Sequence, residues 1–161
     1  MAEKFPINRI IGVIKKGPQA TCEIRGSSEY PFVSGRVLFY KVVDGVLVLA
    51  NVAGLPDINQ SGFYGFHIHG GNDCSGTEQD SFANSLTHYN PSGTAHPKHA
   101  GDLPPLLGNQ GLAFQAFYTE RFTVCEIVNR TVIIHSGPDD FTSQPAGNAG
   151  KKIACGVIRK T

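Results

Sequence analysis

The sequence predicts an all-β domain, a sandwich or flattened barrel of about eight short strands, and three observations lead to this prediction. Short runs of alternating or aliphatic residues recur along the chain, turn signals separate them, and no long segment repeats its apolar residues with a helical period. Glycine (19) and proline (10) are abundant, as many tight turns require. With 161 residues we expect a single domain over residues 1–161, with residues 1–18 as an N-terminal extension.

The first strands are expected between residues 19 and 55. Residues 20–25 alternate in character, and Val33, Val37 and Phe39 share one face of a strand by the period of two. Residues 45–52 are rich in β-branched and aliphatic side chains. Turn signals such as Gly26-Ser-Ser separate these runs. Further strands are expected near 64–69, 112–118, 122–128, 130–135 and 153–158.

Two long irregular stretches, 70–110 and 136–151, lie between the expected strands. Loops of this length inside a compact domain are usually functional, so we expect the functional residues there and at the ends of the adjacent strands.

Charge and hydropathy argue against several classes of partner. Charged residues make up 17% of the chain, the net charge is +1, and no Lys/Arg run is present, so we predict no nucleic-acid partner. No stretch approaches the ~20 apolar residues that span a bilayer, so we predict no membrane partner. The apolar run Ile10–Ile14 is too short for a signal peptide and ends in Lys15 and Lys16. These features favour a cytoplasmic protein, and an exported mature domain is the alternative.

All six histidines lie between residues 67 and 135, which indicates a metalloprotein because imidazole is the commonest protein ligand for zinc and copper. His67 and His69 are two apart on an expected strand, so both point to one face while Phe66 and Ile68 point into the core. A lone strand histidine is more often a hydrogen-bonding residue than a ligand. The pair, with four more histidines in reach, favours ligation.

His135 follows the same alternation, with Val132 and Ile134 on the opposite face of its strand. His96, His99 and Asp102 recur at three-residue steps in a loop rich in proline and glycine. Three ligands this close can enclose one side of a small cation, and their nitrogen and oxygen donors suit zinc. The alternative for this segment is a solvated polar loop.

His88 stands between these two groups and can complete both. A neutral imidazole ligates through one nitrogen, whereas a deprotonated one can use two. The first set is then all nitrogen, which suits copper, and contains His67, His69, His88 and His135. The second set contains His88, His96, His99 and Asp102.

At this point the chain resembles a known family, the copper/zinc superoxide dismutases, over roughly residues 19–158. The motifs occur in the family's order and are Gly65-Phe-His-Ile-His69, His88-Tyr-Asn-Pro91, His99-Ala-Gly-Asp102-Leu, Arg130-Thr-Val-Ile-Ile-His135, Asp139-Asp140 and Gly147-Asn-Ala-Gly-Lys-Lys-Ile-Ala-Cys-Gly-Val-Ile158. The resemblance implies an eight-stranded Greek-key, immunoglobulin-like barrel or sandwich. It also implies an antioxidant oxidoreductase that disproportionates superoxide to dioxygen and hydrogen peroxide.

The resemblance assigns a role to each site residue. It implies copper at His67, His69, His88 and His135, zinc at His88, His96, His99 and Asp102, and His88 as the bridge between the two ions. Asp139 resembles the carboxylate that links a copper histidine to a zinc histidine. Cys74 and Cys155 resemble the family's disulfide, and Cys22 and Cys125 are then expected to be buried free thiols.

The chain also departs from the family, as a bacterial-type member with shortened loops would. Lys152 stands where an arginine usually guides the superoxide anion; lysine keeps the charge but lacks the planar fork of donors. Residues 141–146 form a short version of the electrostatic loop, and the zinc loop is also short. We therefore expect reduced anion binding, weaker long-range steering and less rigid zinc binding.

Two other functions are weighed against this expectation. A catalytically weak or inactive metal-binding relative is the first alternative, and the full set of ligands argues against it. A zinc hydrolase would need an open zinc position and a general base, and the sequence offers neither. The resemblance further implies superoxide as the partner molecule and allows a homodimer.

Overall fold

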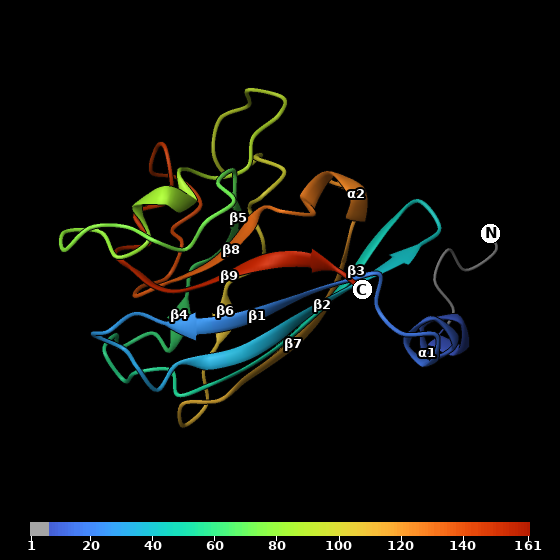
Figure 1. Cartoon of the computed structure of the whole chain (residues 1–161), viewed down its shortest axis with the longest axis horizontal. Coiled ribbons are helices and arrows are strands. Elements are labelled where there is room, and N and C mark those ends of the chain that lie inside the picture. Colours follow the sequence, from blue (N-terminus) through green and yellow to red (C-terminus); the bar gives the residue numbers. More distant parts are fainter. Residues whose placement is uncertain (1–6) are drawn as a thin grey trace.

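The computed structural model describes residues 7–161, and its framework is one curled antiparallel sheet (Figure 1). The seven strands of this sheet follow the order β5-β8-β9-β1-β2-β3-β7. Their bounds are β1 Ala20–Gly26, β2 Ser34–Val42, β3 Gly45–Ala53, β5 Phe66–His69, β7 Ala113–Thr119, β8 Thr131–His135 and β9 Lys152–Lys160. Strands β1, β2 and β3 are successive hairpin partners, whereas the connections from β3 to β5 and from β7 to β8 cross between the two edges, as in a Greek key.

A second, two-stranded ladder lies between the edges of the large sheet. Strand β4 (Phe63–Tyr64) pairs with β6 (Leu106–Leu107) and leads into β5 through Gly65. Strand β6 in turn contacts β7. The expected strand at 64–69 is therefore split in two. At Gly65 a Cβ atom would lie 2.8 Å from the Cβ of Ala149, so the backbone packs closely there. The predicted all-β barrel or sandwich is confirmed, with the edge strands joined by this small ladder.

The core fills the inside of the curled sheet because the strands alternate as the sequence predicts. In β1, for example, Ala20, Cys22 and Ile24 are buried while Glu23 and Arg25 are exposed. Phe39 of β2, Phe66 of β5 and other buried aliphatic residues complete the main cluster. Packing of this core therefore holds β5 and β8, the two strands of the sheet that carry histidines, in fixed positions.

The expected strand at 122–128 is wrong, because this segment contains the short helix α2 (Val124–Ile127). Thr123 and Glu126 form a capping box, in which the Thr123 backbone and hydroxyl both donate to Glu126 Oε2. The Thr-Val-Cys-Glu sequence carries this signal. The local capping chemistry therefore prevails over the β-branched composition of the segment.

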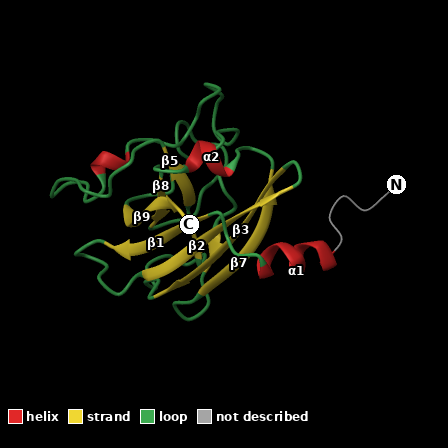
Figure 2. Ribbon diagram, turned by 45° about the vertical axis from the view of Figure 1, so that its right-hand side comes forward, coloured by secondary structure: helices red, strands yellow, loops and turns green. Residues whose placement is uncertain are grey.

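A second helix, α1 (Ile7–Lys15), lies in the expected N-terminal extension, of which residues 1–6 are outside the described part. Ile10 and Val13 pack on Tyr40, Val42 and Leu47 on the outer face of the sheet. No long segment of the sequence has a helical period, but a helix as short as α1 gives no such signal, because Ile10 and Val13 repeat over little more than one turn. Figure 2 shows α1 beside the ends of β2, β3 and β7.

A disulfide joins Cys74, in the long loop after β5, to Cys155 of β9, as the resemblance implies. The bond closes a loop with a sequence separation of 81 residues, for which the chain-entropy account gives about 4 kcal/mol of stabilisation. Cys22 is buried and free, as predicted, and burial raises the pKa of its thiol. Cys125 is free but exposed, so its predicted burial is wrong, because α2 turns it toward solvent.

Among residues 7–161, the two long stretches expected between strands are indeed irregular apart from the short 3₁₀ helix η1 (Ala83–Ser85) and β6. No helix in this part of the chain is long and apolar enough to cross a membrane.

Candidate metal centre

Strand β5 presents two histidines to the site while it anchors its other face in the core. Phe66 and Ile68 are fully buried members of the main hydrophobic cluster, and His67 and His69 lie on the opposite face. β5 is an edge strand that pairs with β8 on one side only, in a register that places His67 opposite Ile133. Its other edge is therefore free to receive the long loop.

The loop that carries His88 and Asp102 docks along this free edge. Ile68 N donates to Gly101 O at 2.9 Å, and Tyr89 N donates to Ile68 O at 2.8 Å. Isolated bridges then place His88 beside His69 and Asp102 beside His67. Gly101 is required at this contact, since a Cβ atom there would lie 2.1 Å from the Ile68 carbonyl oxygen.

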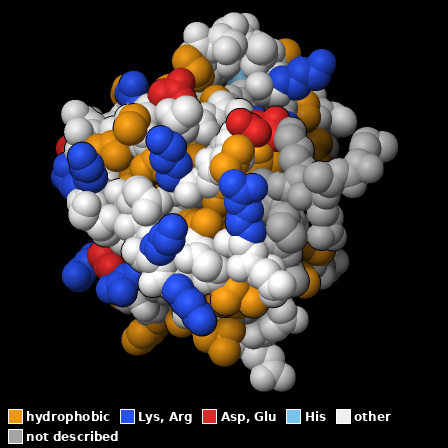
Figure 3. All heavy atoms as spheres, turned by 90° about the vertical axis from the view of Figure 1, so that its right-hand side faces the viewer, with side chains coloured by type: hydrophobic (Ala, Val, Ile, Leu, Met, Phe, Trp, Pro, Cys, Tyr) orange, Lys and Arg blue, Asp and Glu red, His pale blue; other side chains and the backbone are white. Residues whose placement is uncertain are grey.

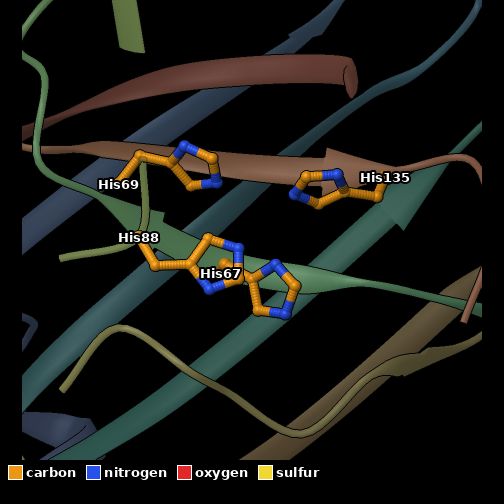
Figure 4. Close-up of side chains that lie close together, drawn as sticks. All are labelled: His67, His69, His88 and His135. Carbon is orange, nitrogen blue, oxygen red and sulfur yellow. The ribbon is translucent and has the colours of Figure 1, made fainter. Parts of the chain in front are cut away.

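His135 closes the first set from the end of β8, where a register shift follows Ile134. As predicted, Val132 and Ile134 point into the core. The structure therefore brings together four histidines from β5, the 70–105 loop and β8, and Figure 4 shows their rings gathered around one small space. One donor atom from each of these histidines lies within 4.8 Å of the others.

In this first set the free lone pairs point inward. His67 Nδ1, His69 Nε2, His88 Nε2 and His135 Nε2 are buried and have no hydrogen-bond partner. Such orphaned acceptors are costly unless a ligand satisfies them. Four imidazole nitrogens that converge on one point form a donor set suited to copper. The residues present therefore fit the copper ion that the resemblance implies.

The other ring nitrogen of three of these histidines holds the ring in place. His67 Nε2 donates to Asp139 Oδ2 at 2.8 Å, His69 Nδ1 donates to Leu86 O at 2.8 Å, and His135 Nδ1 donates to Gly150 O at 3.1 Å. Each hydrogen bond fixes the tautomer that leaves the inward nitrogen unprotonated.

The second set is arranged around a carboxylate. The Nδ1 atoms of His88, His96 and His99 lie 2.7, 3.1 and 3.3 Å from oxygens of Asp102. Tetrahedral coordination at Zn–N distances of about 2.0–2.1 Å needs donors about 3.3 Å apart, which the separations from His96 and His99 match, whereas the shorter one from His88 is a hydrogen bond. Among residues 7–161, His88 alone belongs to both sets, with Nε2 toward the first and Nδ1 toward the second.

Asp139 connects the two sets. Its Oδ2 accepts from His67 and its Oδ1 accepts from His96 Nε2 at 2.9 Å. Both bonds orient a ring whose other nitrogen faces a metal position. The structure thus places Asp139 between one histidine of each set, where the resemblance expects it.

Burial sets the charge state of the centre. Loss of solvent lowers the pKa of His67 and of His69, and with the nearby His67 it lowers the pKa of His135 to about 3. These rings are therefore neutral at physiological pH, as metal ligation requires. Burial alone would raise the pKa of Asp139, but the hydrogen bonds that it accepts, led by that from His67, lower it to about 2.

Several residues support the second set without any signal in the sequence. Arg121 Nη1 donates to the carbonyl oxygens of Pro97, His99 and Asp102 at 3.0, 3.3 and 3.1 Å. Gln144 accepts from His96 N and donates to His96 O. Arg121 and Gln144 thus hold the loop that carries His96, His99 and Asp102 in place. Their partners are backbone atoms, which leave no pattern in the sequence.

Lys152 lies beside the first set, but its charge is shared with an acidic residue that the sequence analysis missed. Its Nζ donates to Asp80 Oδ2 at 2.8 Å and to Phe82 O at 3.1 Å. Burial raises the pKa of Asp80, but the hydrogen bonds that it accepts from Lys152 and from the Phe82 N–H, together with the charge of Lys152, lower it overall. Lys152 and His135 both line a surface hollow of about 370 Å³, which also reaches His69, His88 and His99. This hollow is a path from solvent to both ligand sets.

Comparison with known proteins agrees with this geometry. The family model for copper/zinc superoxide dismutase (SODC) matches residues 33–158. The chain belongs to the copper/zinc superoxide dismutase family. It is 37% identical to "Superoxide dismutase [Cu-Zn] 2" of Aquifex aeolicus, over 79% of this chain and 80% of that protein. It is 32% identical to "Superoxide dismutase [Cu-Zn]" of Paramecium bursaria Chlorella virus 1, over 78% of this chain and 72% of that protein.

The three-dimensional comparison gives the same family. The "Cu/Zn superoxide dismutase from Brucella abortus" superposes with a TM-score of 0.73 and 26% sequence identity, over 86% of this chain and 98% of that chain. As a member of this family, the protein is an oxidoreductase of a group of proteins that use copper and zinc. The two groups of histidines and Asp102 are where the described residues could hold these ions.

Proposed function

We propose that this chain disproportionates superoxide at a copper ion held by His67, His69, His88 and His135, next to a zinc ion held by His88, His96, His99 and Asp102. The observation that carries the proposal is the convergence of four buried, unpartnered imidazole nitrogens, one of which belongs to a ring shared with the second set. When bound, copper supplies the one-electron oxidation and reduction, and zinc is redox-inert.

The overall reaction converts two superoxide ions and two protons into one dioxygen and one hydrogen peroxide. One superoxide is oxidised and the other is reduced, so no further oxidant or reductant is needed. The chain must therefore admit an anion, keep the ligand rings in place and supply protons. Residues around the two ligand sets can perform each of these tasks.

Lys152 admits the anion. It is the cation on the wall of the hollow that leads to His69, His88 and His135. Its ammonium acts as a point charge rather than as a planar fork of donors. Asp80 holds this ammonium at 2.8 Å and offsets part of its charge. Attraction of superoxide is therefore weaker than an unpaired cation would give.

His88 holds a proton close to the reacting anion. Its Nε2 faces the first set and is a basic nitrogen whenever it is not bound to a metal. Its Nδ1 stays oriented by Asp102 Oδ1 at 2.7 Å. His67 is kept in its ligating tautomer by Asp139, and His135 by the Gly150 carbonyl oxygen.

Elemental analysis combined with superoxide consumption tests the proposal. Protein loaded with both metals is expected to contain one copper and one zinc per chain and to consume superoxide, and chelation followed by copper addition is expected to restore the rate. The inactive metal-binding alternative would retain zinc and consume no superoxide at any copper loading.

A further inference from the structure

Helix α1 has one face bound to the sheet and another that remains apolar and exposed. Ile10 and Val13 pack on the sheet, whereas Ile11 and Ile14 are 45% and 39% exposed. At the adjacent turn between β2 and β3, Val43 is 52% exposed. The sheet contact holds α1 against the protein body, so the isoleucines are displayed on a fixed helix.

Cations surround these apolar residues. Arg9 lies in the first turns of α1, Lys15 ends it and Lys16 follows, and no acidic residue occurs in the helix. A groove of about 690 Å³ between α1 and the β2–β3 turn brings Lys41 next to Arg9 and Lys16, with Asp44 as the acidic residue in its lining. Four cations in this region are partly offset by Asp44 and by Glu120, which the Tyr118 hydroxyl contacts together with the Asp44 carbonyl oxygen. The remaining excess of positive charge compares with a net charge of +1 for the whole chain.

The α1 surface, which we define as Arg9, Ile11, Ile14, Lys15, Lys16 and Lys41, lies away from the metal centre. Figures 1 and 2 both place α1 at the ends of β2, β3 and β7, and the long loops of the metal centre at the other side of the molecule. Figure 3 views the α1 side and shows Lys and Arg side chains scattered among hydrophobic ones. A partner on this surface would leave the hollow beside Lys152 open.

The combination of charge and apolar exposure selects the kind of partner. A nucleic acid would bind the cations through its phosphates, but its backbone offers no apolar surface for two exposed isoleucines one helical turn apart. A second copy docked through the same surface would bring like charges together. A bilayer with anionic headgroups satisfies both features, because cations bind the headgroups while apolar side chains enter the acyl boundary.

We propose that the α1 surface docks this protein peripherally on membranes rich in anionic lipids. The sequence predicts no membrane partner because no segment can span a bilayer. Peripheral docking needs no such segment, and the display of the isoleucines depends on how α1 packs. The exposed area is small and the charge modest, so the binding is reversible and depends on salt.

Cosedimentation of the full chain with vesicles tests this inference. Vesicles of phosphatidylcholine alone are compared with vesicles that contain about one-third phosphatidylserine, at low and high salt. We expect binding to the anionic vesicles, loss of this binding at high salt, and little binding to the neutral ones. Equal binding to both kinds of vesicle, or none to either, would overturn the proposal.

Two paired variants separate the contributions of charge and apolar contact. Lys15→Gln with Lys16→Gln should lower the partition coefficient about 25-fold, since each cation near an anionic surface contributes about fivefold. Ile11→Ser with Ile14→Ser should lower it about tenfold, because both side chains leave the acyl boundary. Circular dichroism and metal content check that each variant is folded.

Control variants remove two cations, or one exposed hydrophobic side chain, at the other end of the strands. Arg25→Gln with Lys151→Gln, and Phe114→Ser, whose side chain is 70% exposed on β7, should leave vesicle binding unchanged. Equal losses in these controls would mean nonspecific adsorption. If the isoleucine variant binds normally and duplex DNA competes with vesicles, the surface binds polyanions instead. A concentration-dependent dimer that both α1 variants abolish would assign it to a second copy.

Discussion

The two ligand sets share His88 but are built in opposite ways. In the first set, three histidines come from strands, and the inward nitrogens have no partner among the described residues. In the second set, all donors come from the loop, and three Nδ1 atoms surround the carboxylate of Asp102. Strands fix the first set before any ion binds. In the second set, Asp102 satisfies His88 Nδ1 by a hydrogen bond, whereas His96 Nδ1 lies near the carboxylate without a hydrogen bond. One centre thus contains a set whose ligands are held in place by strands and a set whose ligands also contact each other through a carboxylate.

The largest effect is expected from a substitution that removes a ligand from one set and leaves the other set intact. His135→Asn removes a ligand of the first set only, and it should abolish copper binding and lower superoxide consumption by more than about 100-fold. Zinc content should stay close to that of the parent, since His135 is not in the second set. His96→Asn is the matched variant on the other side and should lose zinc first. Loss of both metals from both variants would show that the two sets are not separable.

Asp139 is the contact that couples the sets, so its removal should weaken both. Asp139→Asn replaces one acceptor oxygen with an amide that cannot accept from a ring N–H. Copper and zinc affinities should each fall about 10–100-fold, as is typical for partners that orient metal ligands. Competition with chelators of known affinity measures this. Asp140→Asn, at an exposed neighbour that binds Ser143, is the control and should leave both affinities unchanged.

The metal-free protein should become less stable in acid, because its buried histidines resist protonation in the folded state. Burial lowers the pKa of His67, His69 and His135 in the folded state, so below pH 6.5 the unfolded chain binds more protons. The free energy of unfolding should therefore decrease, by on the order of a few kcal/mol, as the pH falls from 6.5 toward 3.

Asp139 is an acid rather than a base, and its effect on the free energy of unfolding falls at lower pH. Its stabilisation is present above its ordinary pKa of 3.8 and is lost as the pH falls toward 2. Urea unfolding at a series of pH values measures both effects. In His135→Asn the decrease between pH 6.5 and 3 should be smaller, and an unchanged pH profile would contradict this assignment.

The smallest expected effect concerns the approach to the first set. Asp80→Asn leaves the Lys152 charge uncompensated while it keeps an oxygen for the Phe82 N–H bond. Superoxide consumption at low salt should rise about two- to fivefold and become more dependent on salt. Stopped-flow rates measure it, with Glu78→Gln as a control on the same loop. A lower rate would mean that Asp80 positions Lys152 rather than neutralising it.

Much of the metal centre is predictable from the sequence because strand periodicity is local. Alternation places Phe66 and Ile68 in the core and leaves His67 and His69 together, and the structure brings them beside His88 and His135. The same reasoning is wrong at 122–128, where the Thr123 and Glu126 capping box forms a helix. It also misses α1, a helix too short for a long-range period to show.

The sequence by itself determined the β architecture and the identity of the seven candidate ligands, because both follow from residue types at short, regular spacings. Its motifs also carried the resemblance to the family. Only the tertiary structure decided which nitrogen of each ring is free, that Asp80 shares the charge of Lys152, and which face of α1 is exposed. These properties depend on contacts between segments that are far apart in the chain. Backbone carbonyls such as Leu86 O and Gly150 O, which select the tautomers, exist at every position and acquire a role only when folding brings a ring beside them.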